Sequence, residues 1–242
     1  MKKFILLVVF IVAGVSISQT QDVMTVKLKD GTLHEFKVEE VGEVTFGSSE
    51  ISPSCPVAEA IDLGLPSGTK WASWNVGASK PEEYGGYYAW GETEEKDYYD
   101  WSTYTHCDGS GESCHHIGDD IAGTEYDVAH VKWGSSWRMP TKAQRDELKE
   151  NCTREWTQLN GVNGTLVTGL NGNTIFLPAA GYCDLFGLSR YAGSVGYYWL
   201  SSHYSSYYER HSYSLYFTSS GGWYSIFSDD RDKGFSVRAV CP

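Results

Sequence analysis

The feature that most constrains this fold is the scarcity of long periodic segments in a chain rich in glycine and tryptophan. The 242 residues include 26 glycines and nine tryptophans, and from Ile61 onward the apolar residues form short runs between Gly, Asn and Ser turns. Such runs predict short strands rather than a bundle of long helices. The expected strands are Leu166–Thr168, Thr174–Leu177, Tyr197–Ser201, Ser214–Thr218, Trp223–Phe227 and Phe235–Val240.

One segment carries a clear helix signal. Thr141 is a suitable N-cap, and Leu148 fits a helix that runs to about Asn151. A second helical turn is expected between Thr124 and Val131. Because most expected strands follow these helices along the chain, the sequence predicts an α+β fold.

The N-terminus has the pattern of a secretory signal peptide. Two lysines precede an apolar run from Phe4 to Val15, and the small residues Ser16 and Ser18 occupy the positions that a signal peptidase reads. The run is too short to span a bilayer. We therefore expect an exported protein, without membrane insertion, whose mature chain starts near Gln19 and resides at the cell surface, in the periplasm or outside the cell.

The sequence also predicts a small module before the main domain. Val23–Leu28 and Thr32–Val38 alternate apolar and polar residues around an Asp-Gly pair, which is a strong hairpin signal. A third short strand is expected at Glu43–Phe46, and the stretch after it has linker composition. The expected organisation is a signal peptide at 1–18, a small β module at 22–47, a linker at 48–54 and the main domain at 55–242.

Charge and cysteine content narrow the partners and the compartment. The formal net charge is −12 and the basic residues are scattered singly, so nucleic acid is not an expected partner. Six cysteines in an exported chain permit disulfides. Cys107 and Cys114 flank a short turn-forming stretch and are predicted to pair. Cys55 and Cys241 are candidates to form a disulfide that joins the ends of the main domain. Cys152 and Cys183 are then the remaining two cysteines, and both of these pairings stay open.

Six ordered motifs resemble a known family. They are AIDLGLPSGTKWASWNVGA (60–78), YGGYYAWGE (84–92), WGSSWRMPT (133–141), FLPAAGY (176–182), YYWLSS (197–202) and GFSVRAV (234–240). Together they resemble the Fibrobacter succinogenes major paralogous domain, over roughly Ile61 to Val240. That family is related to formylglycine-generating enzymes and to the variable proteins of diversity-generating retroelements.

The resemblance implies a C-type lectin-like, loop-rich domain whose first and last strands lie side by side. It also implies that Trp71 and Trp74 seed the core and that Arg138 and Arg238 have structural roles. Family members often carry Cys where this chain has Trp74, so the resemblance gives no cysteine pairing. The catalytic relatives use a pair of cysteines near the end of the domain, whereas Cys241 has no second cysteine nearby.

The C-terminal segment predicts a binding face. Between Tyr197 and Tyr224 stand eight of the seventeen tyrosines and eight serines. Tyr offers a rigid amphipathic surface and Ser an adaptable hydrogen-bonding group, as in antibody paratopes. The alternative is an ordinary β region with tyrosines at its edges. The predicted contact residues are His203, Tyr204, Ser205, Ser206, Tyr207, Tyr208, Arg210, Tyr213, Trp223, Tyr224, Asp229, Asp230 and Arg231.

This segment is also compatible with targeted diversification. Adenine-directed mutagenesis of Asn-type codons yields a residue set that excludes Trp, Lys, Glu, Gln and Met, as the resemblance to variable proteins implies. From Ser201 to Asp232 only Glu209 and Trp223 break that set.

No catalytic constellation or cofactor motif is recognised in the sequence. The loop from His106 to Asp120 collects histidines and acids, but the spacing of His115, His116, Asp119 and Asp120 fits no known metal site, so no metal is expected. The predicted function is an exported, non-enzymatic module that binds a protein or a glycan. A structural or adhesin subunit of the cell envelope is the alternative, and an enzyme of unknown reaction ranks third.

Overall fold

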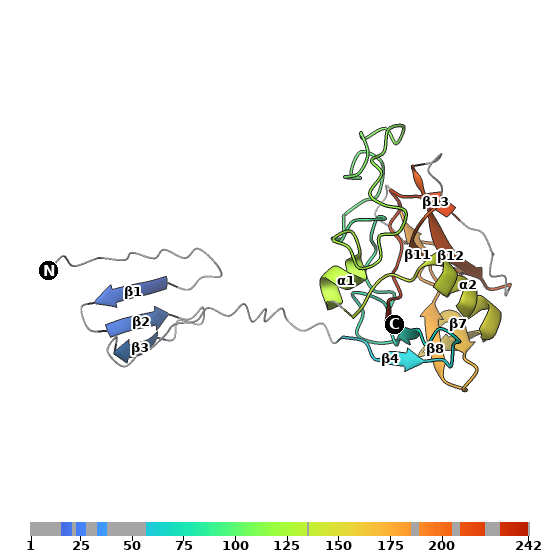
Figure 1. Cartoon of the computed structure of the whole chain (residues 1–242), viewed down its shortest axis with the longest axis horizontal. Coiled ribbons are helices and arrows are strands. Elements are labelled where there is room, and N and C mark those ends of the chain that lie inside the picture. The colour runs from blue at the N-terminus through green and yellow to red at the C-terminus, as the bar shows by residue number, and fades with distance from the viewer. Residues whose placement is uncertain are drawn as a thin grey trace. The chain divides into compact units, whose positions relative to one another are not determined.

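The computed structural model describes residues 57–134, 136–184, 189–204, 209–220 and 228–241, together with the backbone of 16–20, 23–27 and 33–37. The chain divides into two compact units, Met1–Ile51 and Ser52–Pro242, and Figure 1 shows the elements of both. Within the described residues, no helix has the length and apolar character needed to cross a membrane.

The N-terminal unit contains a three-stranded antiparallel sheet in the order β1–β2–β3. The predicted hairpin is confirmed, because β2 (Val23–Lys27) pairs with β3 (Leu33–Lys37). On its other side β2 pairs with β1 (Ser16–Thr20), a strand that overlaps the expected signal-peptide cleavage position. The strand expected at Glu43–Phe46 lies outside the described residues.

The larger unit has an α+β structure made of small antiparallel sheets and helices. Its strand orders are β14–β5–β4, β6–β7–β8, β10–β9 and β11–β12–β13. The described elements are β4 (Ala60–Asp62), β5 (Lys70–Ala72), α1 (Val128–Trp133), α2 (Lys142–Asn151), β6 (Thr153–Leu159), β7 (Val162–Thr168), β8 (Thr174–Pro178), β9 (Tyr182–Cys183), β10 (Ser189–Arg190), β11 (Val195–His203), β12 (His211–Thr218), β13 (Ser228–Asp230) and β14 (Val240–Cys241).

The first two strands and the last strand of this unit share one sheet, in which β4 and β14 flank β5 rather than pair with each other. β5 pairs with β4 on one side and with β14 on the other, so that Trp71 is opposite both Ile61 and Val240. The Trp71 side chain is fully buried. Trp74 is partly buried and packs against the core, so both tryptophans contribute to the core as expected.

Helix α2 begins where the sequence predicts. The Thr141 hydroxyl accepts a hydrogen bond from the Gln144 backbone N–H, and the Gln144 side chain accepts one from the Thr141 N–H. This capping box satisfies two of the N–H groups that a helix start leaves unpaired. Leu148 is fully buried and packs into the core. Helix α1 begins at Val128, inside the expected helical segment, and is capped by the buried carboxylate of Asp127.

Strand β11 forms the wall between two parts of the core. Trp199 belongs to one cluster and stacks on Phe235 with ring centroids 4.2 Å apart. Tyr198 and Leu200, which point to the opposite face, belong to the other cluster together with Phe217. Because successive strand residues alternate between faces, both faces of β11 are buried. The end of this strand is therefore held firmly by apolar packing.

Several sequence-based strand predictions need correction. Phe235–Val240 forms isolated bridges, and only Val240 lies in a regular strand, β14. Strand β6 (Thr153–Leu159) was missed because its residues are polar and mostly exposed or half-buried. The strands expected at 166–168, 174–177, 197–201 and 214–218 are confirmed within β7, β8, β11 and β12. The strand expected at Trp223–Phe227 lies outside the described residues.

Arg238 joins strands β5 and β8 in the core. The residue is 1% exposed, and its guanidinium donates hydrogen bonds to the Asn75 side chain and to the carbonyl oxygens of Ala72 and Phe176, at 2.8 to 2.9 Å. It thus joins three segments that are distant in sequence. Burial lowers the pKa of this guanidinium to about 10, and the group stays protonated at neutral pH. The structural role expected for Arg238 is confirmed.

The disulfide between Cys107 and Cys114 is present, with the two Cα atoms 3.9 Å apart. It closes a small loop in which the Asp108 N–H donates to the Ser113 carbonyl. Cys152 and Cys183 are both free thiols. Cys55, the proposed partner of Cys241, lies outside the described residues.

We expect the Arg238→Met variant to lose about 3 kcal/mol or more of unfolding free energy, because three buried acceptors would lose their donor. Urea denaturation monitored by tryptophan fluorescence measures this change. Lys70→Met, at an exposed position of β5, is the matched control and should stay within about 0.5 kcal/mol of the wild type. Equal stability of the two variants would contradict the role assigned to Arg238.

Candidate functional site

The predicted binding residues that the structure describes lie at one end of the sheet β11–β12–β13. β11 ends at His203, which is opposite Ser212, and β12 then pairs with β13 so that His211 is opposite Asp230. The remaining predicted residues lie outside the described part of the chain, and these are Ser205, Ser206, Tyr207, Tyr208, Trp223 and Tyr224.

Arg231 lies inside the domain, so the expectation of an exposed polar contact is corrected for this residue. Its Nε donates to the Tyr104 hydroxyl at 2.8 Å. Its Nη1 donates to the carbonyl oxygens of Glu209 at 2.6 Å and His115 at 3.1 Å. The guanidinium also lies over the Trp90 ring, 4.6 Å from its centroid. Arg231 therefore ties the segment around His115 to the chain that enters β12.

Tyr204 and Tyr213 are half-buried and form an aromatic group with His211. The Tyr204 ring centroid lies 5.1 Å from that of Tyr213 and 6.3 Å from that of His211. Lys142, the first residue of α2, places its ammonium 5.7 Å from the Tyr213 ring centroid. This group combines partly exposed aromatic surface with a cation.

Arg210 and Asp230 extend this surface with charged groups. Arg210 lies 4.9 Å from the Trp101 ring centroid and its Nε is 3.3 Å from an Asp230 carboxylate oxygen. The same oxygen is 3.0 Å from His211 Nε2. Trp101 in turn contacts the disulfide loop, where a Cβ on Gly111 would lie 2.5 Å from the indole ring. Glycine is required there by this close approach and by its φ of +77°.

Asp229 has an unusual environment for a carboxylate. It is half-buried on the face opposite Asp230, and one of its oxygens accepts a hydrogen bond from the Ser214 hydroxyl at 3.3 Å. Burial raises the pKa of this carboxyl to about 7, against the opposing effect of the Ser214 hydrogen bond. Asp229 thus changes charge near neutral pH.

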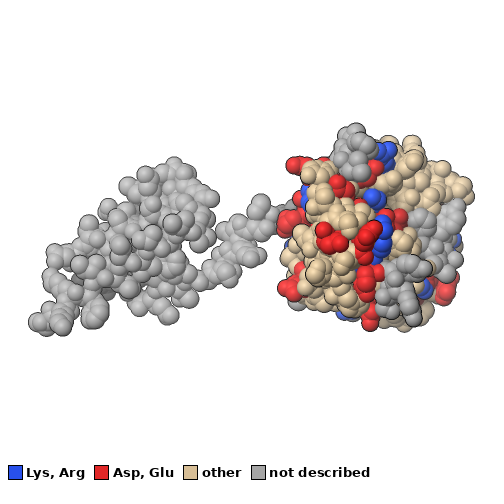
Figure 2. Space-filling view, turned by 90° about the horizontal axis from the view of Figure 1, so that it is seen from above, with Lys and Arg blue, Asp and Glu red and all other residues tan. Residues whose placement is uncertain are grey.

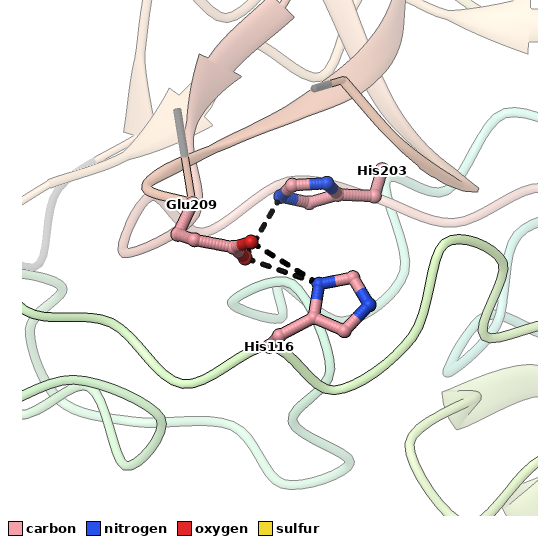
Figure 3. A group of neighbouring side chains, drawn as sticks. All are labelled: His116, His203 and Glu209. Carbon is pink, nitrogen blue, oxygen red and sulfur yellow. Dashed lines mark hydrogen bonds and ion pairs between the residues drawn. The ribbon is translucent and has the colours of Figure 1, made fainter. Parts of the chain in front are cut away.

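His116, His203 and Glu209 converge beside this surface (Figure 3). His116 Nδ1 lies 3.2 and 3.3 Å from the two Glu209 carboxylate oxygens, and His203 Nε2 lies 3.4 Å from one of them. One potential ligand atom from each side chain lies within 4.8 Å of the others. The three residues come from the segment after the disulfide loop, from the end of β11 and from the residue two before β12.

His203 is 8% exposed, so the predicted direct contact with a partner is corrected to a buried position facing Glu209. Its ring packs near Trp90, with centroids 5.8 Å apart. Burial lowers the pKa of His203, with Glu209 acting in the opposite direction, so the imidazole is neutral at neutral pH. Within the described residues, His203 Nε2 has no hydrogen-bond partner, although it faces the Glu209 carboxylate.

The segment that carries His116 is anchored on both sides. Before it, the disulfide closes at Cys114, the His115 N–H donates to the His106 carbonyl at 2.7 Å, and Arg231 binds the His115 carbonyl. After it, the Asp119 carbonyl accepts a hydrogen bond from the His203 backbone N–H at 2.8 Å. These contacts fix the backbone of His116 against the end of β11.

The sequence did not predict this cluster. His116, His115, Asp119 and Asp120 were weighed as metal ligands and no metal was expected, because their spacing fits no known site. The structure brings only His116 of these four residues together with His203 and Glu209. Glu209 was missed as a site residue. The sequence feature that could have identified Glu209 is that it differs from the Tyr, Ser, His, Asp and Arg residues that dominate the surrounding segment.

Comparisons of the chain with protein-family models, with curated proteins and with solved structures found no match.

The raised pKa of Asp229 predicts a pH-dependent stability. In the unfolded chain the Asp229 carboxyl ionises near its ordinary pKa of about 4, whereas in the folded chain its pKa is about 7. The contribution of the protonated carboxyl to the free energy of unfolding is therefore complete below about pH 4, and it is lost as pH rises from about 4 to about 7. Asp229→Asn, which cannot ionise, should show a flatter stability profile in urea titrations from pH 4 to 8.

The exposed Asp97→Asn variant is the control for this experiment and should keep the wild-type slope. A wild-type slope in Asp229→Asn would show that the carboxyl titrates normally.

Proposed function

We propose that the protein is an exported binding module that recognises a protein or a glycan. The binding surface is the end of the sheet β11–β12–β13 at which β11 ends and β12 begins. The observation that carries this proposal is the juxtaposition of partly exposed aromatic and charged groups there. Tyr204, His211 and Tyr213 form the aromatic group, while Arg210 and Asp230 supply charge beside Trp101. Aromatic side chains and Arg are the residue types that dominate recognition surfaces.

The rigidity of the support favours the same conclusion. The strand that ends at His203 is buried on both faces, so side chains at its end are presented without a large entropic cost on binding. Acidic and basic side chains are interspersed on the visible face of the larger unit (Figure 2). Recognition is therefore attributed to short-range complementarity rather than to a field of one sign.

The fold proposed for this module is C-type lectin-like. Two observations support this assignment, the pairing of the last strand, β14, with β5 near the start of the unit and the set of small sheets. The six sequence motifs support it as well. On this fold, residues Ser201 to Asp232 are also proposed as a target of diversification. A reverse transcriptase gene and a near-copy of this coding segment, differing at adenines, should be found in the neighbouring DNA. A neighbourhood without them would favour a fixed receptor or a structural subunit.

Replacing Tyr204, Tyr207 and Tyr208 together by Ala tests the binding surface. If these side chains contact a partner, the melting temperature should fall only slightly, because side chains that face a partner contribute little to folding and Tyr204 is only half-buried. Binding of the labelled protein to a glycan microarray and to intact bacterial cells should weaken by roughly thirtyfold or more, as expected for loss of aromatic anchors.

Tyr198→Ala is the matched control, because Tyr198 is 2% exposed and its loss should cost about 3 to 5 kcal/mol of stability. A triple variant that melts as early as Tyr198→Ala would place the three tyrosines in the core and remove the basis of the proposed surface.

A further inference from the structure

We propose that His116, His203 and Glu209 form a binding site for a divalent transition-metal ion of the zinc type. This inference does not depend on the proposed recognition of a protein or glycan. It rests on the convergence of the three side chains from separate segments (Figure 3) and on the environment of each ligand atom.

The separations between ligand atoms suit a tetrahedral ion. Zinc lies about 2.0 to 2.1 Å from imidazole nitrogen and carboxylate oxygen, so neighbouring ligand atoms in a tetrahedron are about 3.3 Å apart. His116 Nδ1 is 3.2 Å from Glu209 Oε1, and His203 Nε2 is 3.4 Å from Glu209 Oε2. The two imidazoles need only a small approach, and His116 is an exposed side chain that has room to move.

The donor set selects the class of metal. Two neutral imidazoles and one carboxylate suit zinc and its first-row neighbours, whereas calcium and magnesium prefer oxygen ligands. Three protein ligands leave a fourth tetrahedral position for water or for a donor group of another molecule. The exposed side of His116 makes this position accessible from solvent.

His203 provides the independent observation that points to a ligand. Its side chain is 2% exposed and its Nε2 faces Glu209, but this atom lacks a hydrogen-bond partner among the described residues. A buried polar atom without a partner is unfavourable. Coordination of a metal would use the lone pair of this nitrogen.

The surrounding contacts orient the ligands as metal sites require. Arg231 donates to the backbone carbonyls of Glu209 and His115, and thereby fixes the chain at one ligand and beside another. His116 Nε2, the nitrogen not directed at Glu209, lies 3.7 Å from an Asp119 carboxylate oxygen. A carboxylate near the second nitrogen of a metal-bound histidine is a common arrangement. The Arg231 guanidinium lies 3.9 Å from the Glu209 carboxylate. Its positive charge repels a metal cation and lowers the affinity of the site for zinc.

The test uses the exported chain, purified without a histidine tag and dialysed against a chelator. Isothermal titration with zinc chloride should give one ion per chain, and Co²⁺ should give the visible absorption of a four-coordinate site. His116→Ala and Glu209→Gln should each weaken zinc binding by more than about 100-fold, beyond the loss expected from changing an orienting residue. His115→Ala, an exposed neighbour outside the cluster, should bind as the wild type does.

Thermal melts distinguish a loss of zinc binding from a loss of folding in the variants. Without metal, all four proteins should melt at similar temperatures, and zinc should raise the melting temperature of the wild type and His115→Ala only. If zinc fails to bind stoichiometrically, or binds equally to His116→Ala and Glu209→Gln, the cluster is only a hydrogen-bonded ion pair and the proposal is wrong.

Discussion

The structure depends on buried guanidinium groups that donate hydrogen bonds to backbone carbonyl oxygens. A domain made of short strands and loops brings many carbonyl oxygens into its interior, and each one left unpaired is unfavourable. Arg238 supplies three donors where the beginning, the middle and the end of the larger unit meet. Arg231 does the same near the candidate site. The core and the candidate site are thus each held together by a buried arginine that donates hydrogen bonds to separate segments of the chain.

This arrangement explains why the site is rigid although loops build it. β11 is buried on both faces and ends at His203. The segment of His116 is bound to that strand end through the Asp119 carbonyl and to Arg231 through the His115 carbonyl. The half-buried aromatic group of Tyr204, His211 and Tyr213 lies at the same end of the sheet. Loop residues are therefore presented on a support with little freedom.

Local signals in the sequence were sufficient for part of the fold. The N-cap of α2 at Thr141, the β2–β3 hairpin and the Cys107–Cys114 pair each depend on residues close in sequence, and all three were predicted correctly. Burial of Arg231 and His203 was not predicted, because it follows from packing against Trp90, which is distant in sequence. The approach of Glu209 to His116 was not predicted either, because the two residues are 93 positions apart in the sequence.

The disulfide loop affects the entropic cost of assembling the cluster. Cys114 is two residues before His116, and the bridge to Cys107 closes the turn from which the His116 segment leaves. A covalent link of this kind removes conformations from the unfolded chain, so that less entropy is lost when the turn folds. The bridge therefore couples the order of the His116 segment to the oxidation state of two cysteines.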